Sequence, residues 1–161
     1  MKKYAIEIKW GLLFTIMMLL WMMLEKELGW HDELIDKHYI YTNFVAVPAV
    51  AFYVIALLDK RQNYYHGFMT YRQGFLSGLI ISLVVMVLSP LSQVITSLYI
   101  TPHYFENVIK YIVGQKQMTQ EEAVKTFNLS NYILQSTIFA PIMGILTTAL
   151  VTIFIKRKAR S

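Results

Sequence analysis

Long apolar blocks dominate the pattern of residues along this chain. No charged residue occurs from Gln73 to His103 or from Thr126 to Ile155. A further block runs from about Tyr39 to Leu58, and the first is strictly charge-free from Trp10 to Leu24. A helix needs about 20 predominantly apolar residues to cross a hydrocarbon core about 30 Å thick. The pattern therefore predicts four membrane-spanning helices, at approximately 6–28, 39–58, 74–100 and 131–155.

The first block is short for a span, so flanking residues must extend it to the two membrane interfaces. Lys9 and Lys26 can extend their charged groups to the interfaces, and Trp10 can lie among the headgroups. A cleaved signal peptide is the alternative, but no small-x-small cleavage site follows Leu24, and Glu7 interrupts the basic leader. We expect an uncleaved span.

The segment between the third and fourth spans, approximately 102–128, is longer than a minimal connection between neighbouring helices. Thr101 followed by Pro102 predicts one helix start, and Gly114 predicts its end. Thr119 with Glu122 forms a capping box that predicts a second start. The expected fold is all-α: a four-span transmembrane bundle, residues 1–161 as a single integral membrane domain, with a helical extramembrane hairpin. We expect the hairpin's apolar stripe to rest on the bundle or the headgroups rather than on a partner.

Composition and charge agree with a membrane protein, since 56% of the residues are hydrophobic and the net charge is +5. Alternate segments divide the basic residues unequally. One side holds 10 of the 15, namely Lys2, Lys3, Lys9, Lys60, Arg61, Arg72, Lys156, Arg157, Lys158 and Arg160. Lysine and arginine near span ends stay in the cytoplasm, so both chain ends are predicted to be cytoplasmic. This topology accounts for the positive charge, and no nucleic-acid partner is expected.

Burying polar side chains at membrane depth costs free energy, so their presence there calls for a structural or functional explanation. Helical spacing places them on one face of the third span and one face of the fourth. One interpretation is helix packing, in which small side chains let backbones approach and hydroxyls bond between helices. Its candidate residues are Gly74, Gly78, Ser82, Ala140, Gly144 and Thr148. This interpretation is preferred.

The second interpretation is a polar pocket in the outer half of the membrane. The third span runs outward and the fourth inward, which brings their polar groups to one depth, and Pro90 and Pro141 free backbone carbonyls nearby. The candidate residues are Asn43, Ser89, Ser92, Gln93, Thr96, Gln135 and Thr137.

No catalytic residue, metal ligand or cofactor is predicted. The chain has no cysteine, which excludes thiolate chemistry, and its four histidines fall outside the charge-free parts of the spans. Glu27, His31 and His38 could share one helical face, but no established metal-binding pattern is present. We interpret them as surface residues at the membrane edge.

Local sequence features resemble a known family over nearly the whole chain. They include Trp10-Gly11-Leu12, Gly29 with His31-Asp32, Tyr41-Thr42-Asn43, Gln73-Gly74-Phe75, and Phe127-Asn128-Leu129. In these the chain resembles the bacterial membrane family catalogued as domain of unknown function 4199. The resemblance implies a four-span inner-membrane protein of Bacteroidetes-type Gram-negative bacteria, with a periplasmic outer side. It implies no activity, substrate or site residue.

Two functional classes remain. The preferred one is a non-enzymatic scaffold, accessory or regulatory membrane subunit, whose partners are the lipid bilayer and either a second copy of itself or another membrane protein. The alternative is a carrier or channel for a small neutral or lipid-like solute. A charged residue deep within a predicted span would have favoured transport, and the sequence places none there.

Overall fold

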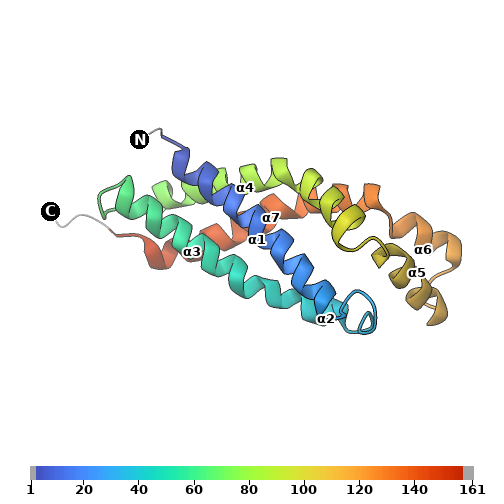
Figure 1. The fold of residues 1–161 in the computed structure, drawn as a ribbon. Coiled ribbons are helices and arrows are strands. Elements are labelled where there is room, and N and C mark those ends of the chain that lie inside the picture. The colour runs from blue at the N-terminus through green and yellow to red at the C-terminus, as the bar shows by residue number, and fades with distance from the viewer. Residues whose placement is uncertain (1–2, 158–161) are drawn as a thin grey trace.

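The computed structural model describes residues 3–157. Four long apolar helices could each cross a membrane: Ala5–Glu27, His38–Asn63, Tyr71–Ile100 and Leu129–Ile155. The first is α1. The second consists of α2 (His38–Tyr41), a 3₁₀ turn η1 (Thr42–Val45) and α3 (Ala46–Asn63). The third is α4 (Tyr71–Ile95) with a π-helical turn η2 (Thr96–Ile100), and the fourth is α7 (Leu129–Ile155). The all-α, four-span fold class is confirmed (Figure 1).

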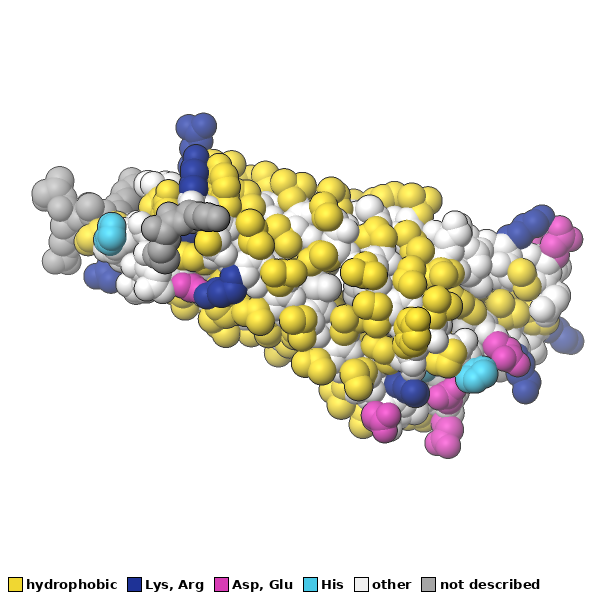
Figure 2. All heavy atoms as spheres, turned by 45° about the horizontal axis from the view of Figure 1, so that its top comes forward, with side chains coloured by type: hydrophobic (Ala, Val, Ile, Leu, Met, Phe, Trp, Pro, Cys, Tyr) yellow, Lys and Arg dark blue, Asp and Glu magenta, His cyan; other side chains and the backbone are white. Residues whose placement is uncertain are grey.

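The bundle has two different ends (Figure 1). We call the end with residues 3 and 157 and the 64–70 loop the terminal end. The opposite end, with the 28–37 loop, α5 (Tyr104–Gly114) and α6 (Gln120–Thr126), is called the hairpin end. Hydrophobic side chains cover the middle of the molecule and charged side chains gather at its ends (Figure 2). That distribution suits a lipid bilayer around the middle. Lys2, Lys158 and Arg160, which contribute to the charge count, lie outside the described residues.

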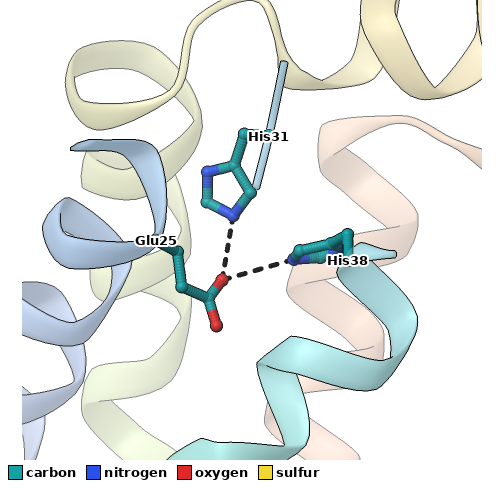
Figure 3. A group of neighbouring side chains, drawn as sticks. All are labelled: Glu25, His31 and His38. Atoms are coloured by element: carbon teal, nitrogen blue, oxygen red, sulfur yellow. Dashed lines mark hydrogen bonds and ion pairs between the residues drawn. The ribbon is translucent and has the colours of Figure 1, made fainter. Parts of the chain in front are cut away.

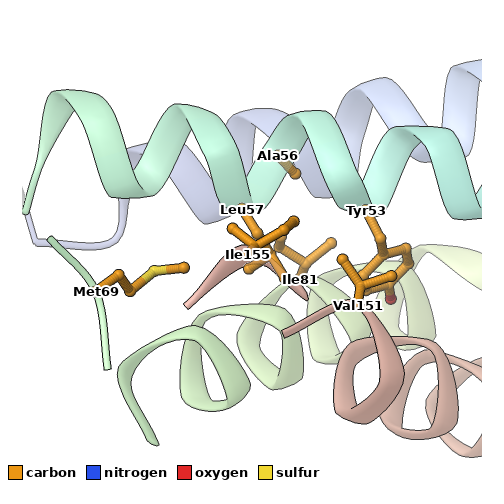
Figure 4. Packing of buried hydrophobic residues seen from close by; sticks show 7 residues of the cluster. All are labelled: Tyr53, Ala56, Leu57, Met69, Ile81, Val151 and Ile155. Carbon is orange, nitrogen blue, oxygen red and sulfur yellow. The ribbon is translucent and has the colours of Figure 1, made fainter. Parts of the chain in front are cut away.

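The helices form a four-membered ring of contacts. The most extensive contact is between α4 and α7; α1 packs beside α4, and α3 packs against α7, α1 and α4. The buried hydrophobic cluster joins α3, α4 and α7 towards the terminal end (Figure 4). Its members are Tyr53, Ala56, Leu57, Met69, Ile81, Val151 and Ile155.

Small residues allow α4 and α7 to approach closely. A Cβ atom built on Gly74 would lie 2.7 Å from Thr152 Cγ2, and one on Gly78 would lie under 3.0 Å from the Thr148 side chain. On the other helix, a Cβ atom on Gly144 would meet both Ser82 and the Tyr53 hydroxyl within 3.0 Å. The hydrophobic effect contributes little to helix association within lipid. Membrane helices are therefore held together by close packing of this kind.

Charged and backbone interactions close the terminal end. Lys9 pairs with Asp59, which also accepts a hydrogen bond from Trp10 Nε1 at 2.6 Å. Arg61 Nη1 donates to the Ile155 carbonyl at 2.7 Å, satisfying one of the free carbonyls at the end of α7. The backbones of Met69 and Arg157 form an antiparallel bridge with two 2.9 Å hydrogen bonds.

One of the two predicted starts of the hairpin helices is confirmed and the other is wrong. Thr119 caps α6 in a full capping box with Glu122, as predicted. The predicted cap at Thr101 is wrong: α5 begins at Tyr104, and the Thr101 hydroxyl donates instead to the Thr96 carbonyl at 3.2 Å. That bond and the one from Thr101 N to the same carbonyl close the wide turn η2 at the end of the third span, and α5 starts two residues beyond the predicted position, with His103 as its N-cap.

Candidate functional site

Three potential metal ligands meet at the hairpin end (Figure 3). The Glu25 Oε2 atom lies 2.9 Å from His31 Nε2 and 3.3 Å from His38 Nε2. One potential ligand atom from each residue lies within 4.8 Å of the other two. Glu25 and His31 are buried, at 0% and 2% exposure, and the His38 side chain is 18% exposed. This is the densest group of ionisable ligands that the described residues place together.

The local chain path explains how the three residues converge. Glu25 lies in the last turn of α1, and the following chain reverses at Gly29, whose φ of +72° is a conformation that glycine adopts readily. Hydrogen bonds from Trp30 N to Glu25 O and from Leu34 N to Gly29 O hold the reversal. His31 therefore folds back over the end of α1, while His38 enters from the first residue of α2.

Surrounding aromatic and polar side chains fix the orientation of these groups. Trp21 Nε1 donates to the second Glu25 oxygen at 2.5 Å. The Tyr104 hydroxyl, on α5, lies 3.4 Å from His38 Nδ1 and 3.3 Å from the Tyr132 hydroxyl. Both imidazole rings pack edge-on against the Tyr104 ring. Burial raises the pKa of the Tyr104 hydroxyl, so it stays protonated and available for hydrogen bonding.

A second contact anchors α5 to the loop that carries His31. Asn107 Nδ2 donates to the His31 carbonyl at 3.0 Å and also bonds the Asp32 carboxylate. The extramembrane hairpin thus packs on the loop between the first two spans, and its apolar stripe contributes the buried Val108. This contact joins residues far apart in the sequence and holds α5, with Tyr104, against the loop that carries His31.

Two hollows lead to the protein surface near the cluster. One, of about 290 Å³, is lined by Lys26, His31, Asp32, Thr101, Pro102, His103 and Tyr104. The other, of about 590 Å³, lies between the 28–37 loop and α5. The smaller hollow reaches His31 directly, and it is large enough for several water molecules at about 30 Å³ each. Water or an ion can therefore approach the cluster from the hairpin end.

The structure corrects the interpretation of Glu27, His31 and His38 as a group of surface residues. His31 is buried, and the carboxylate beside it comes from Glu25, whereas Glu27 is exposed. Helical spacing suggested Glu27 because it assumed one continuous helix. The residues after Leu28 turn back instead, and the turn at Gly29 is the sequence signal that could have indicated this.

The proposed packing residues lie mostly at the α4–α7 contact. Gly74, Gly78, Ser82, Gly144 and Thr148 are buried, and Ala140 is half-buried. The Ser82 hydroxyl donates to the Gly78 carbonyl and lies 2.8 Å from the Tyr53 hydroxyl, which links α4 to α3.

The proposed pocket residues are not all brought together. Ser89 and Thr137 meet across α4 and α7 at 3.3 Å, and Ser89 also donates to the Met86 carbonyl that Pro90 leaves free. Gln93 donates to Ser97 on its own helix at 3.0 Å. Thr96 is buried, and Ser92 and Gln93 are half-buried. Asn43 and Gln135 are exposed, and Asn43 bonds the Tyr39 carbonyl one turn away.

Sequence reasoning missed a buried ion pair at the terminal end. Lys60 Nζ lies 2.8 Å from Glu7 Oε1, and Ser77 donates to the same carboxylate at 2.7 Å. The side chains of Lys60 and Glu7 are 3% and 2% exposed. The Lys60 ammonium also donates to the backbone carbonyl of Lys3 at 2.7 Å. Glu7 therefore joins α1, α3 and α4.

Comparisons with known proteins identify a family and nothing beyond it. The sequence model of a family described as "Protein of unknown function (DUF4199)" matches residues 9–157. No curated protein and no solved structure matches the chain.

Proposed function

Because the chain belongs to the DUF4199 family, whose function is unknown, we propose that it is a non-enzymatic scaffold, accessory or regulatory subunit of a bacterial inner membrane. The observation that carries the proposal is that polar side chains within the spans make hydrogen bonds and packing contacts with other parts of the bundle. Ser82 bonds the Tyr53 hydroxyl on α3, and Ser89 on α4 bonds Thr137 on α7. The threonines of α7 fill the space beside Gly74 and Gly78. Such groups serve association between helices.

The orientation in this proposal follows from charge. The terminal end carries the basic excess, and the hairpin end carries most of the acids: Glu25, Glu27, Asp32, Glu33, Asp36, Glu106, Glu121 and Glu122. Retention of lysine and arginine in the cytoplasm then places both chain ends inside and the hairpin in the periplasm.

Cysteine accessibility distinguishes helix packing from a solute pocket. Because the chain has no natural cysteine, a thiol reagent can label only the introduced one. The variants are Ser89→Cys and Gln93→Cys, with Leu88→Cys as the matched control on a neighbouring face of α4. Membrane-impermeant thiol reagents are added to the periplasmic side of intact cells or oriented vesicles. We expect all three positions to stay unlabelled, because Ser89 and Gln93 face packed helices. Labelling at Ser89 and Gln93 but not Leu88 would favour the carrier or channel instead.

Purification from native membranes tests the subunit role itself. A scaffold or accessory subunit should co-purify with a partner at fixed stoichiometry or with a second copy of itself, measured by native mass spectrometry in gentle detergent. Recovery of a lone monomer after mild chemical cross-linking in intact cells would contradict the proposal.

A further inference from the structure

We propose that Glu25, His31 and His38 bind a first-row divalent transition-metal ion, such as Zn²⁺, at the hairpin end of the bundle. Two imidazoles and one carboxylate are ligands that Zn²⁺ and its neighbours accept, and three protein ligands leave a fourth position for water. The site is independent of the function proposed above, because the three residues lie outside the α4–α7 packing contact (Figure 3).

Two of the three separations between ligand atoms are close to those around such an ion, and all three ligand atoms lie within 4.8 Å of one another. In a tetrahedral site with bonds of about 2.0–2.1 Å, neighbouring ligand atoms are about 3.3–3.4 Å apart. The separation of His38 Nε2 from Glu25 Oε2 is 3.3 Å, and that of His31 Nε2 from the same oxygen is 2.9 Å. Coordination would require small side-chain adjustments that bring all three ligand atoms to about 2.0–2.1 Å from one ion, and the partly exposed His38 has the most freedom to make them.

The charge balance at the cluster also favours a cation. The Glu25 carboxylate is fully buried, and a buried carboxylate needs an opposite charge or strong donors. His31, His38 and Trp21 bond the carboxylate, and a divalent ion held by Glu25 and the two imidazoles would compensate its charge without protonation of either histidine. Lys26, the next residue, lines the neighbouring hollow, and no ion pair between it and Glu25 occurs within residues 3–157.

The groups around the ligands have the arrangement that metal-bound imidazoles require. When Nε2 of His38 binds a metal, its Nδ1 carries the proton and needs an acceptor, and the Tyr104 oxygen lies 3.4 Å away. Trp21 holds the second carboxylate oxygen, which leaves Oε2 directed at both histidines. No side chain or backbone group within residues 3–157 bonds the buried His31 Nδ1, and water in the adjoining hollow can satisfy it.

The route to the site comes from the hairpin end. His31 forms part of the wall of the 290 Å³ hollow, and the exposed His103 and Asp32 lie on the same wall. An ion can therefore enter from the aqueous side without crossing the packed helices. A bound ion would join the end of α1, the 28–37 loop and the start of α2, beneath the ring of Tyr104 on α5.

Metal binding is measured on the purified full-length protein in detergent, carrying an affinity tag free of histidine. Zn²⁺ titration is followed by competition with a chromophoric chelator, and Co²⁺ titration by its visible d–d absorption, which reports coordination geometry. We expect one ion per chain, a thermal transition raised by Zn²⁺, and tetrahedral or five-coordinate Co²⁺ spectra.

Variants distinguish this site from adventitious binding. His31→Gln, His38→Gln and Glu25→Gln should each weaken Zn²⁺ binding by about 100-fold or more, since changes even to groups around metal ligands cost about 10- to 100-fold. His103→Gln is the matched control, because that exposed imidazole lies on the same hollow but outside the cluster, and its affinity should equal that of the wild type. His38→Gln is the variant least prone to misfolding, as His38 is partly exposed. Absence of stoichiometric Zn²⁺ on the folded wild type, or equal affinity in the His38→Gln variant and wild type, would overturn the proposal.

Discussion

Removing the cation from the buried pair at the terminal end should destabilise the protein strongly. In the Lys60→Met variant, the Glu7 carboxylate stays buried and keeps the Ser77 hydroxyl, but it loses the ammonium 2.8 Å away. The Lys3 carbonyl also loses its donor, and Tyr64 loses a cation 3.7 Å above its ring. Breaking a buried ion pair from one side costs about 3–5 kcal/mol. We expect a loss of that size in the free energy of unfolding.

A double-mutant cycle separates the pair from its surroundings. Glu7→Gln should also destabilise, because it leaves the Lys60 ammonium unpaired. The double variant Glu7→Gln/Lys60→Met removes both charges together, so its cost should be smaller than the sum of the single costs by about 2 kcal/mol or more. The free energy of unfolding can be measured by equilibrium titration with a denaturing detergent in mixed micelles.

Lys9→Met is the matched control at the same end. The Lys9 side chain is 52% exposed, and its pairing with Asp59 is a surface interaction. Pairs of that kind contribute about 0–1 kcal/mol. The reasoning is refuted if Lys60→Met costs no more than Lys9→Met, or if the costs of Glu7→Gln and Lys60→Met simply add.

Further predictions concern packing, topology, the hairpin and the cluster. Gly78→Ala should reduce the free energy of unfolding by about 1–3 kcal/mol, because the new Cβ atom would collide with Thr148. Gly114→Ala, whose Cβ atom would meet no other described residue within 4 Å, should change it by less than about 0.5 kcal/mol in the same titration. Reporter fusions after Arg72 and Arg157 should be active in the cytoplasm and one at Gln117 in the periplasm; a cytoplasmic Gln117 fusion would reverse the assigned orientation. Hydrogen bonds from Thr119 lower the pKa of Glu122, so the capping box should protect α6 amides at neutral pH and lose that protection as the pH falls through the lowered pKa, as read by hydrogen exchange with Thr119→Ala for comparison. Tyr104→Phe should weaken Zn²⁺ binding by about 10-fold through loss of the hydroxyl beside His38, and an unchanged affinity would show that this hydroxyl does not support the ligand.

The spans and the second hairpin helix were predictable from the sequence because their signals are local. A charge-free block long enough to cross the membrane is visible without any knowledge of the fold, and the Thr119 and Glu122 capping box involves neighbours only three residues apart. The helix start at Thr101 was wrongly predicted because Thr101 ends the π-helical turn η2 instead of starting α5, and the sequence does not reveal that turn.

The two clusters of charged groups were missed for a different reason. Glu7 and Lys60 are 53 residues apart, and their meeting depends on how α1 packs on α3. Glu25 and His31 are close in sequence, yet they meet because the backbone reverses at Gly29, which helical spacing cannot represent. Contacts that depend on helix packing or on a loop reversal need the three-dimensional arrangement.

The ion pairs at the terminal end have a consequence for how the protein is made. Both Lys9–Asp59 and Glu7–Lys60 join α1 to α3, two spans that leave the ribosome before α4. Each carboxylate can therefore find its cation before α4 has been synthesised, and neither has to wait, unpaired, near the hydrocarbon region. The later spans add contacts of another kind, the threonines and glycines of α7 and α4. Biogenesis can thus proceed as two successive helical hairpins, the first joined by charge and the second by close packing.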